Sequence, residues 1–363
     1  MTAAIVDQPS PGPLDFEALS KHLADRLIYV VGNARGGSTF TNSAIGIHPQ
    51  ILGVGWNDIV FGRILPQLAS LQAAELRRQM LRPETGKHYD EIVAVRNIGK
   101  ANLRRWNVYV DHVCRSRDLR QLLCLQGLLY WIMHRPTADP GDCSYWCIKE
   151  NTWAGIERLK RIMPKTRLVF VQRDPRSNAL SFAKVYARAR KEHFNDRDIT
   201  RGALDWLRNA AEFALRLNHY DDSLLVYFEE LLSDPPPVLN RLYCELGLEA
   251  LPPSNIHAAL DNLEYTSTKT FEERGRENPT GVHPESLARW QTQLSPEQIA
   301  LVGALTKTGA DYFGYRLDTQ LKLGNIASAL RDTSQRYPFK ALAVYLYCQA
   351  RLLLMRRAKQ IAP

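Results

Sequence analysis

Short apolar runs alternate with amphipathic segments along most of the chain. Three runs rich in β-branched and aromatic residues predict buried strands: RLIYVVG at 26–32, RLVFVQRDP at 167–175, and LLVYFEELL at 224–232, which runs into a turn. Segments with helical character follow them, in order TFTNSAIGI, SNALSFAKVYARARK and VLNRLYCELGL. Another amphipathic helix, WAGIERLKRIM, precedes the second strand. Strands that alternate with helices predict an α/β fold, with a mainly parallel sheet flanked by helices on both faces.

The same pattern suggests how the chain is divided. Residues 1–25 begin with a Pro-rich stretch and are expected to form a flexible lead. We expect one domain over 26–317, with a largely helical insertion at 63–145, rich in Leu, Gln and Arg, on the acceptor side. Residues 318–363 are expected to form a basic, helical C-terminal extension.

Charge and cysteine content narrow the class of protein. The 363 residues carry a formal net charge of +9, which favours anionic partners. Nucleic acid is not expected, because the basic residues are scattered and no nucleic-acid-binding module is present. The six cysteines are dispersed without the paired spacing of a zinc site, so we expect free thiols in a reducing compartment. The N-terminus lacks a signal-peptide core and no run reaches transmembrane length, so a cytoplasmic protein is expected.

The C-terminus has an unusual charge pattern. No acidic residue occurs from Lys340 onward, and five basic residues flank or interrupt the apolar stretch ALAVYLYCQARLLLM. This stretch is too short and interrupted to span a bilayer. Three interpretations remain open: a helix docked on the core, an interfacial helix on an anionic membrane, and a partner-binding helix.

The segment GNARGGST, Gly32 to Thr39, joins the first predicted strand to its helix. It is close to the P-loop pattern G-x4-G-K-[ST], but Ser38 stands at the lysine position and the nearby cation is Arg35. Backbone N–H groups at a helix N-terminus form an anion site that the helix dipole strengthens. We therefore predict a phosphate-binding loop in which Arg35 supplies charge and Ser38 and Thr39 add hydroxyl donors. A plain tight turn is the alternative.

A second polar cluster follows the second predicted strand. Arg173 ends that strand, Pro175 suits the first position of a helix, and Ser177 and Ser181 share one face of that helix. Open α/β sheets bind ligands at the carboxyl ends of their strands. The cluster predicts a second phosphate site, with a structural ion pair between Arg173 and Asp174 as the alternative.

These residues, in this order, resemble sulfotransferases that use 3′-phosphoadenosine 5′-phosphosulfate (PAPS). The family's P-loop-like segment has a Lys or Arg, a small residue, Gly and Ser/Thr-Thr, matched here by Arg35, Gly36, Gly37, Ser38 and Thr39. Its 3′-phosphate motif, an Arg followed eight residues later by a Ser, is matched by Arg173 and Ser181. Three more segments fit: IKENTW, VYFEELLSDP and ARWQTQLSPEQ. The resemblance covers roughly residues 26 to 316.

The resemblance implies a P-loop-type fold whose loop holds the 5′-phosphosulfate of PAPS. The reaction would be in-line transfer of a sulfuryl group to a hydroxyl or amine of a carbohydrate, lipid or small-molecule acceptor, leaving 3′-phosphoadenosine 5′-phosphate (PAP). No metal is expected, because a sulfuryl group carries less negative charge than a terminal phosphoryl group. The resemblance does not predict the oligomeric state.

Several residues are candidates for catalysis. Arg35 would stabilise charge on the leaving phosphate, and a base would take the acceptor's proton. Asp58 is the first candidate base, because family members with an Arg-type loop often have an acid shortly after the His-Pro that follows the first helix, here His48-Pro49. Its alternative role is to cap a helix starting at Ile59. His112 is the second candidate, with an ordinary surface or core histidine as the alternative.

Three further cations are assigned by resemblance. Lys149 matches a family lysine near the donor sulfate or the acceptor. Arg274 and Arg276 lie in a polar segment that could close over the 3′-phosphate or could be a solvated charged loop.

Two other functions remain open. One is a P-loop kinase that uses ATP and Mg²⁺, against which the displaced cation and the Arg173/Ser181 pair argue. The other is a catalytically inactive nucleotide- or glycan-binding protein with the same fold.

Overall fold

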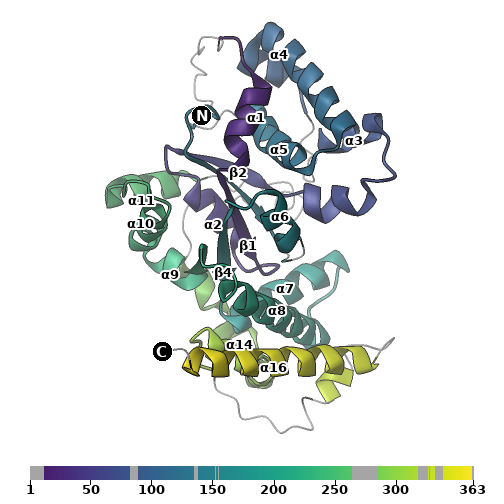
Figure 1. The fold of residues 1–363 in the computed structure, drawn as a ribbon. Helices are drawn as coiled ribbons and strands as arrows, with labels where there is room; N and C mark the ends of the chain where they lie inside the picture. The colour runs from purple at the N-terminus through teal and green to yellow at the C-terminus, as the bar shows by residue number, and fades with distance from the viewer. Residues whose placement is uncertain are drawn as a thin grey trace.

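Five parallel strands form the central sheet, in the order β2-β3-β1-β4-β5 (Figure 1). The computed structural model describes residues 12–81, 89–134, 138–151, 153, 155–263, 284–317, 326, 328–331 and 338–361. Strands β1 (Leu27–Gly32) and β4 (Arg167–Gln172) lie within the first two predicted runs, and β5 (Ser223–Tyr227) starts one residue before the third. All of β1 and nearly all of β4 are buried, as central strands between two helical layers must be. The predicted α/β architecture is confirmed.

Strand register brings three carboxyl ends together. Strand β3 (Tyr145–Glu150) lies between β1 and β2 (Ile51–Asn57). Val31 of β1 is level with Glu150, and Gly32 is level with Val171 of β4. The residues that follow β1, β3 and β4 therefore start from the same edge of the sheet.

Alternate strand residues face two different helical layers. Ile28 and Val30 share one apolar cluster with residues of α2 (Ser38–Ile45), α9 (Phe228–Ser233), α10 (Pro235–Glu245) and α11 (Pro253–Asp261). Tyr29 and Val31 belong to the other cluster, which includes residues of α5 (Leu119–His134), α6 (Ile156–Ile162) and α8 (Asp196–Leu217). The sheet is thus covered on both faces.

Helical segments extend the fold at both ends. The predicted insertion forms α3 (Ala73–Met80), α4 (Glu91–Ser116) and α5, after a π-helix at Val60–Ile64 and a 3-10 turn at Leu65–Gln67. At the other end, α7 (Pro175–Ala189) and α8 pack with α14 (Pro296–Tyr312), and α16 (Pro338–Ile361) packs on α8 and α14. A 3-10 turn (Pro284–Leu287) and α13 (Arg289–Gln293) precede α14. Figure 1 shows α4 and α16 at opposite ends of the molecule.

The N-terminal region corrects one prediction. Within the expected flexible lead, residues Phe16–Ala24 form helix α1, with Phe16 and Leu23 buried against the core. The Asp15 carboxylate accepts hydrogen bonds from the backbone N–H groups of Glu17 and Ala18, which caps the helix. The prediction of a flexible lead is therefore wrong for this part of residues 1–25.

All six cysteines are free, and only Cys244 is exposed. Within the described ranges, no helix combines the length and apolar character needed to cross a membrane.

Candidate active site

The glycine-rich loop leads from β1 directly into α2. The backbone N–H of Gly36 donates to the carbonyl oxygen of Asn33 at 2.7 Å, which closes the turn. Arg35 has a left-handed backbone conformation (φ 68°) and an exposed side chain. Helix α2 has no side-chain cap at its N-terminus. Its first backbone N–H groups are therefore available to an anion.

Gly37 is required by two independent constraints. It has a left-handed conformation with φ 96°. A Cβ atom at this position would lie 2.2 Å from the ring of Phe228, at the start of α9. Only glycine satisfies both the backbone conformation and the close contact.

The structure brings the loop and the second predicted phosphate site into direct contact. The Nη1 of Arg173 donates to the carbonyl oxygen of Arg35 at 3.1 Å, and the Nε of Arg35 donates to the Oγ of Ser181 at 3.4 Å. Asn178, between them on α7, donates to the carbonyl oxygen of Ala34. The ends of β1 and β4 thus form one continuous basic site.

Arg173 lies in an environment that favours an anionic ligand. Its guanidinium lies 4.9 Å from the centre of the Phe228 ring, and its Nε has no hydrogen-bond partner among the described residues. Burial lowers the pKa of Arg173, and the carboxylates of Glu229 and Asp174 oppose this shift. A bound anion would supply a partner for a cation that is costly to bury alone.

The predicted alternative, an ion pair between Arg173 and Asp174, is not the contact that the structure shows. Asp174 forms an ion pair with Arg176 at 2.6 Å and accepts hydrogen bonds from the N–H groups at the start of α7. It is the N-cap of that helix. Arg176 in turn stacks over the ring of Trp290. These contacts hold in place the helix that carries Ser181.

The end of β3 adds polar groups beside the loop. Ser38 Oγ donates to Asn151 Oδ1 at 2.9 Å. Lys149 is level with Val30 of β1, and its buried amine donates to Asn57 Oδ1. Thr39 is half-buried in the first turn of α2. Two polar residues at this edge, Asn151 and Asn178, are not among the predicted site residues. Asn151 directly follows a strand and Asn178 lies in the first turn of a helix, and these positions in the sequence could have identified them.

Asp58 is buried, and its carboxylate is hydrogen-bonded to neighbouring groups of the protein. It is 1% exposed. One oxygen accepts a hydrogen bond from Tyr29 and the other from the backbone N–H of Val60, both at 2.7 Å. The second contact holds the backbone at the start of the π-helix Val60–Ile64, whose N-cap is Ile59 and has no side-chain cap hydrogen bond. The predicted capping of a helix that starts at Ile59 is therefore not what the structure shows. The geometry favours this structural role over catalysis, because a base must reach the acceptor's proton.

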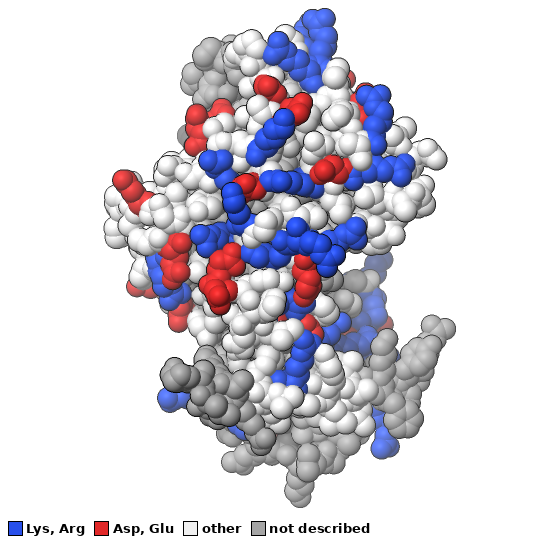
Figure 2. Space-filling model, viewed as in Figure 1, with Lys and Arg blue, Asp and Glu red and all other residues white. Residues whose placement is uncertain are grey.

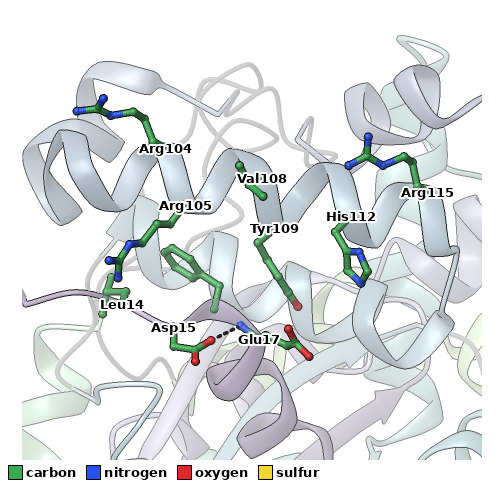
Figure 3. A pocket seen from close by; sticks show the side chains of 10 residues that line it. Leu14, Asp15, Glu17, Arg104, Arg105, Val108, Tyr109, His112 and Arg115 are labelled. Carbon is green, nitrogen blue, oxygen red and sulfur yellow. Dashed lines mark hydrogen bonds between the residues drawn. The ribbon is translucent and has the colours of Figure 1, made fainter.

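His112 does not lie with the other candidates. Figure 3 shows it on α4, above α1, in a pocket of about 670 Å³ that residues 14–17 also line. Those residues precede β1, whereas the glycine-rich loop follows it. His112 is therefore at the opposite edge of the sheet, and the structure does not support it as the base.

Comparison with known proteins agrees with this geometry. The model of the sulfotransferase family matches residues 28–253, more than half of the chain. The chain belongs to the sulfotransferase family. No significant match occurs among curated protein sequences.

Several solved structures align with this chain at low sequence identity. The sulfotransferase domain from the curacin biosynthetic pathway aligns with a TM-score of 0.50 and 13% identity, over 81% of this chain and 98% of that one. The sulfotransferase domain of the Synechococcus PCC 7002 olefin synthase gives 0.47 and 15%, over 86% and 99%. Retinol dehydratase, in a complex with retinol and PAP, gives 0.40 and 15%, over 82% of each chain. At 13% identity, the alignment with the curacin-pathway domain shows a likeness of the fold alone.

The family match covers the loop, β3, β4 and α7 of this sulfotransferase. Arg274 and Arg276 lie beyond it and outside the described residues. Among the residues that the structure describes, no group of three or more His, Cys, Asp or Glu side chains could hold a metal ion.

Proposed function

We propose that this sulfotransferase transfers a sulfuryl group from PAPS to an acceptor hydroxyl or amine. The observation that carries the proposal is the direct contact between two anion-binding segments, through Arg35, Arg173 and Ser181. A nucleotide with phosphate groups at both its 5′ and 3′ positions matches two adjoining basic sites at neighbouring strand ends.

Each segment has its own part in donor binding. The N–H groups at the start of α2 and the side chain of Arg35 would hold the 5′-phosphosulfate. Arg173 and Ser181 would hold the 3′-phosphate, for which a guanidinium and a hydroxyl are suitable donors. Asn151 would position Ser38 through the hydrogen bond between their side chains.

The reaction replaces the bond from sulfur to the donor's phosphate oxygen by a bond from sulfur to the acceptor. The acceptor oxygen or nitrogen forms a bond to sulfur, the bond from sulfur to the 5′-phosphate oxygen breaks, and a proton leaves the acceptor. Negative charge accumulates on the departing phosphate oxygen, where Arg35, the N-terminus of α2 and Lys149 would stabilise it. The products are the sulfated acceptor and PAP. We propose a carbohydrate, a lipid or a small molecule as the acceptor.

The nucleotide preference tests this proposal. Isothermal titration calorimetry would compare PAP, 5′-AMP and ATP with Mg²⁺ as ligands of the unmodified protein. We expect PAP to bind at least tenfold more tightly than 5′-AMP, because a charge-assisted contact to the 3′-phosphate contributes about 1.5–3 kcal/mol. Arg173→Ala should abolish this preference. Arg161→Ala, which removes an exposed arginine from α6, is the matched control and should leave it unchanged.

Two results would contradict the proposal. Equal affinity for PAP and 5′-AMP would show that the protein has no binding site for the 3′-phosphate. Preference for ATP with Mg²⁺ would favour the kinase alternative.

A further inference from the structure

Exposed hydrophobic side chains are concentrated on one helix. Among the described residues, eight large hydrophobic side chains are exposed, and five of them belong to α16. These five are Leu342, Leu346, Tyr347, Leu353 and Leu354, with exposures between 38% and 67%. Such a concentration, unlike single exposed hydrophobic residues, indicates an interaction surface.

The five side chains form one continuous face. Leu342, Leu346 and Leu353 are four and seven residues apart and follow one line along the helix, and Tyr347 and Leu354 follow the adjacent line. The exposed Ala343 and Ala350 lie between the two lines. We call this set of seven residues the α16 apolar face. Figure 2 shows Lys and Arg crossing the middle of the molecule, and mostly uncharged atoms on the described surface below, where Figure 1 places α16.

The opposite side of α16 is fixed to the core. Cys348 and Leu352 are buried, and Leu352 packs near Gly309 of α14. Arg351 pairs with Glu212 of α8 at 2.7 Å, and Arg356 pairs with Asp311 of α14 at 3.2 Å. These contacts fix the rotation of the helix about its axis. The apolar face cannot turn inward without breaking them.

The charge of this segment restricts what can cover the face. From Lys340 to the C-terminus the chain has five basic residues and no acidic one. Two of the five, Arg351 and Arg356, are matched by core carboxylates. Lys340, Arg357 and Lys359 add three more positive charges to this segment of the sequence, near the two ends of the helix.

We propose that the α16 apolar face docks on the surface of an anionic lipid membrane, with the helix parallel to that surface. An apolar face flanked by Lys and Arg is the pattern of interfacial helices. Each basic residue near an anionic surface adds about 1 kcal/mol of attraction. Tyr347 suits the boundary, because its ring is exposed while its hydroxyl accepts a hydrogen bond from Arg351.

A second copy of the chain suits this face less well. In a symmetric dimer the same patch covers itself, so two α16 helices would meet. Each would bring basic ends and no acidic residue of its own, and like charges would oppose one another in either orientation. A membrane supplies the negative charge that the segment lacks.

This inference does not depend on the proposed donor, and lipid binding can be measured without nucleotide. The protein would be sedimented with sucrose-loaded vesicles of phosphatidylcholine alone, or of an equimolar mixture of phosphatidylcholine and phosphatidylglycerol. We expect binding to the mixed vesicles that weakens as salt is raised, and at least tenfold weaker binding to the neutral ones.

Charge placed on the face should abolish binding. In Leu346→Glu, Leu354→Glu and the double variant, we expect the partition coefficient on mixed vesicles to fall at least tenfold. Val108→Glu is the matched control, because Val108 of α4 is as exposed as Leu354 (67% each) but lies at the other end of the molecule. It should bind as the unmodified protein does.

The same variants separate the possible outcomes. Thermal unfolding would confirm that each variant is folded, and sedimentation velocity would report the oligomeric state. The proposal is overturned if the unmodified protein ignores mixed vesicles, if the α16 variants bind as well as the control, or if they dissociate a dimer without changing lipid binding.

Discussion

At the residue scale, the geometry of the candidate active site depends on how little space surrounds the phosphate loop. Gly37 combines a left-handed backbone with a close approach to the Phe228 ring. The same ring lies beneath the guanidinium of Arg173. The Phe228 ring therefore contacts both the glycine-rich loop and Arg173, and a larger side chain at position 37 would displace both.

Gly37→Ala tests this dependence. We expect a loss of at least 2 kcal/mol of unfolding free energy, since the left-handed conformation costs about 1–2 kcal/mol and overpacking costs about 1–3 kcal/mol. Binding of PAP should weaken as well. Gly314→Ala is the control for conformation alone, because Gly314 also has a positive φ (77°) but open space around it. Urea unfolding would measure both variants, and equal losses would contradict the role of the Phe228 contact.

A second residue-scale prediction concerns the buried pair of Tyr29 and Asp58. Removing the Tyr29 hydroxyl leaves one oxygen of Asp58 without its buried donor. Tyr29→Phe should therefore cost about 1–3 kcal/mol of stability near neutral pH. Tyr186→Phe, at an exposed tyrosine on α7, should change stability by less than about 0.5 kcal/mol.

The loss of stability in Tyr29→Phe should depend on pH in a known direction. Burial, followed by the neighbouring carboxylates of Asp58 and Glu150, holds the pKa of Tyr29 well above its ordinary value of 10.0. Stability from a raised pKa is present below the unfolded value and is lost as pH rises above it. The stability deficit of Tyr29→Phe should therefore shrink above about pH 10. A deficit that grows there would contradict this account.

At the scale of secondary-structure elements, the hydrophobic pattern predicted the helices and strands that are long or strongly apolar. The runs that became β1 and β4 are continuous and β-branched, so burial on both faces was evident. Strand β2 was not predicted, because its sequence ILGVGWN contains two glycines and its pairing with β3 is irregular. Gly53 is needed there, because a Cβ atom at this position would lie 3.0 Å from the Cα of Gly46, the residue that follows α2. That requirement is visible only in three dimensions.

The residues proposed to bind phosphate could be identified as candidates because they follow strands in sequence. The candidate bases could not be placed in the same way, because Asp58 and His112 belong to segments whose position depends on tertiary packing. Asp58 is buried and accepts a hydrogen bond from Tyr29. His112 lines a pocket together with residues 14–17, which precede β1. The spacing of Asp58 and His112 along the sequence does not predict where these two side chains lie in the structure.

A buried ion network links α16 to the elements around the site. Glu212 of α8 accepts hydrogen bonds from Arg216 at 2.5 Å and from Arg351 of α16 at 2.7 Å. Arg216 also pairs with Glu157 of α6 and lies over the ring of Trp153, just after β3. One carboxylate therefore joins two guanidinium groups from different helices.

Glu212→Gln should break this link. Removing one partner from a buried ion pair costs about 3–5 kcal/mol, because the remaining charges lose their compensation. Glu245→Gln, at an exposed position on α10, should have little effect. Hydrogen exchange should show faster exchange in α16 of the Glu212 variant and not of the control. Unchanged exchange and stability would show that the Glu212 contact does not hold α16 in place.

At the scale of the whole molecule, the site and the α16 apolar face are separate features of one sulfotransferase. The phosphate loop lies at the carboxyl edge of the sheet, and the apolar face is on the outer side of the C-terminal helix. Helix α8 contacts α7, which carries Ser181, and also α16. If the protein docks through α16, helix α8 would connect the docked helix to the candidate active site.

The most direct test of the central claim is a crystal structure of the complex with PAP. We expect the 5′-phosphate at the backbone N–H groups of Gly37 to Thr39, and the 3′-phosphate on Arg173 and Ser181. Arg35 would then contact phosphate in place of its long hydrogen bond to Ser181. PAP bound elsewhere, or bound with its 3′-phosphate directed away from Arg173, would contradict the account of this site.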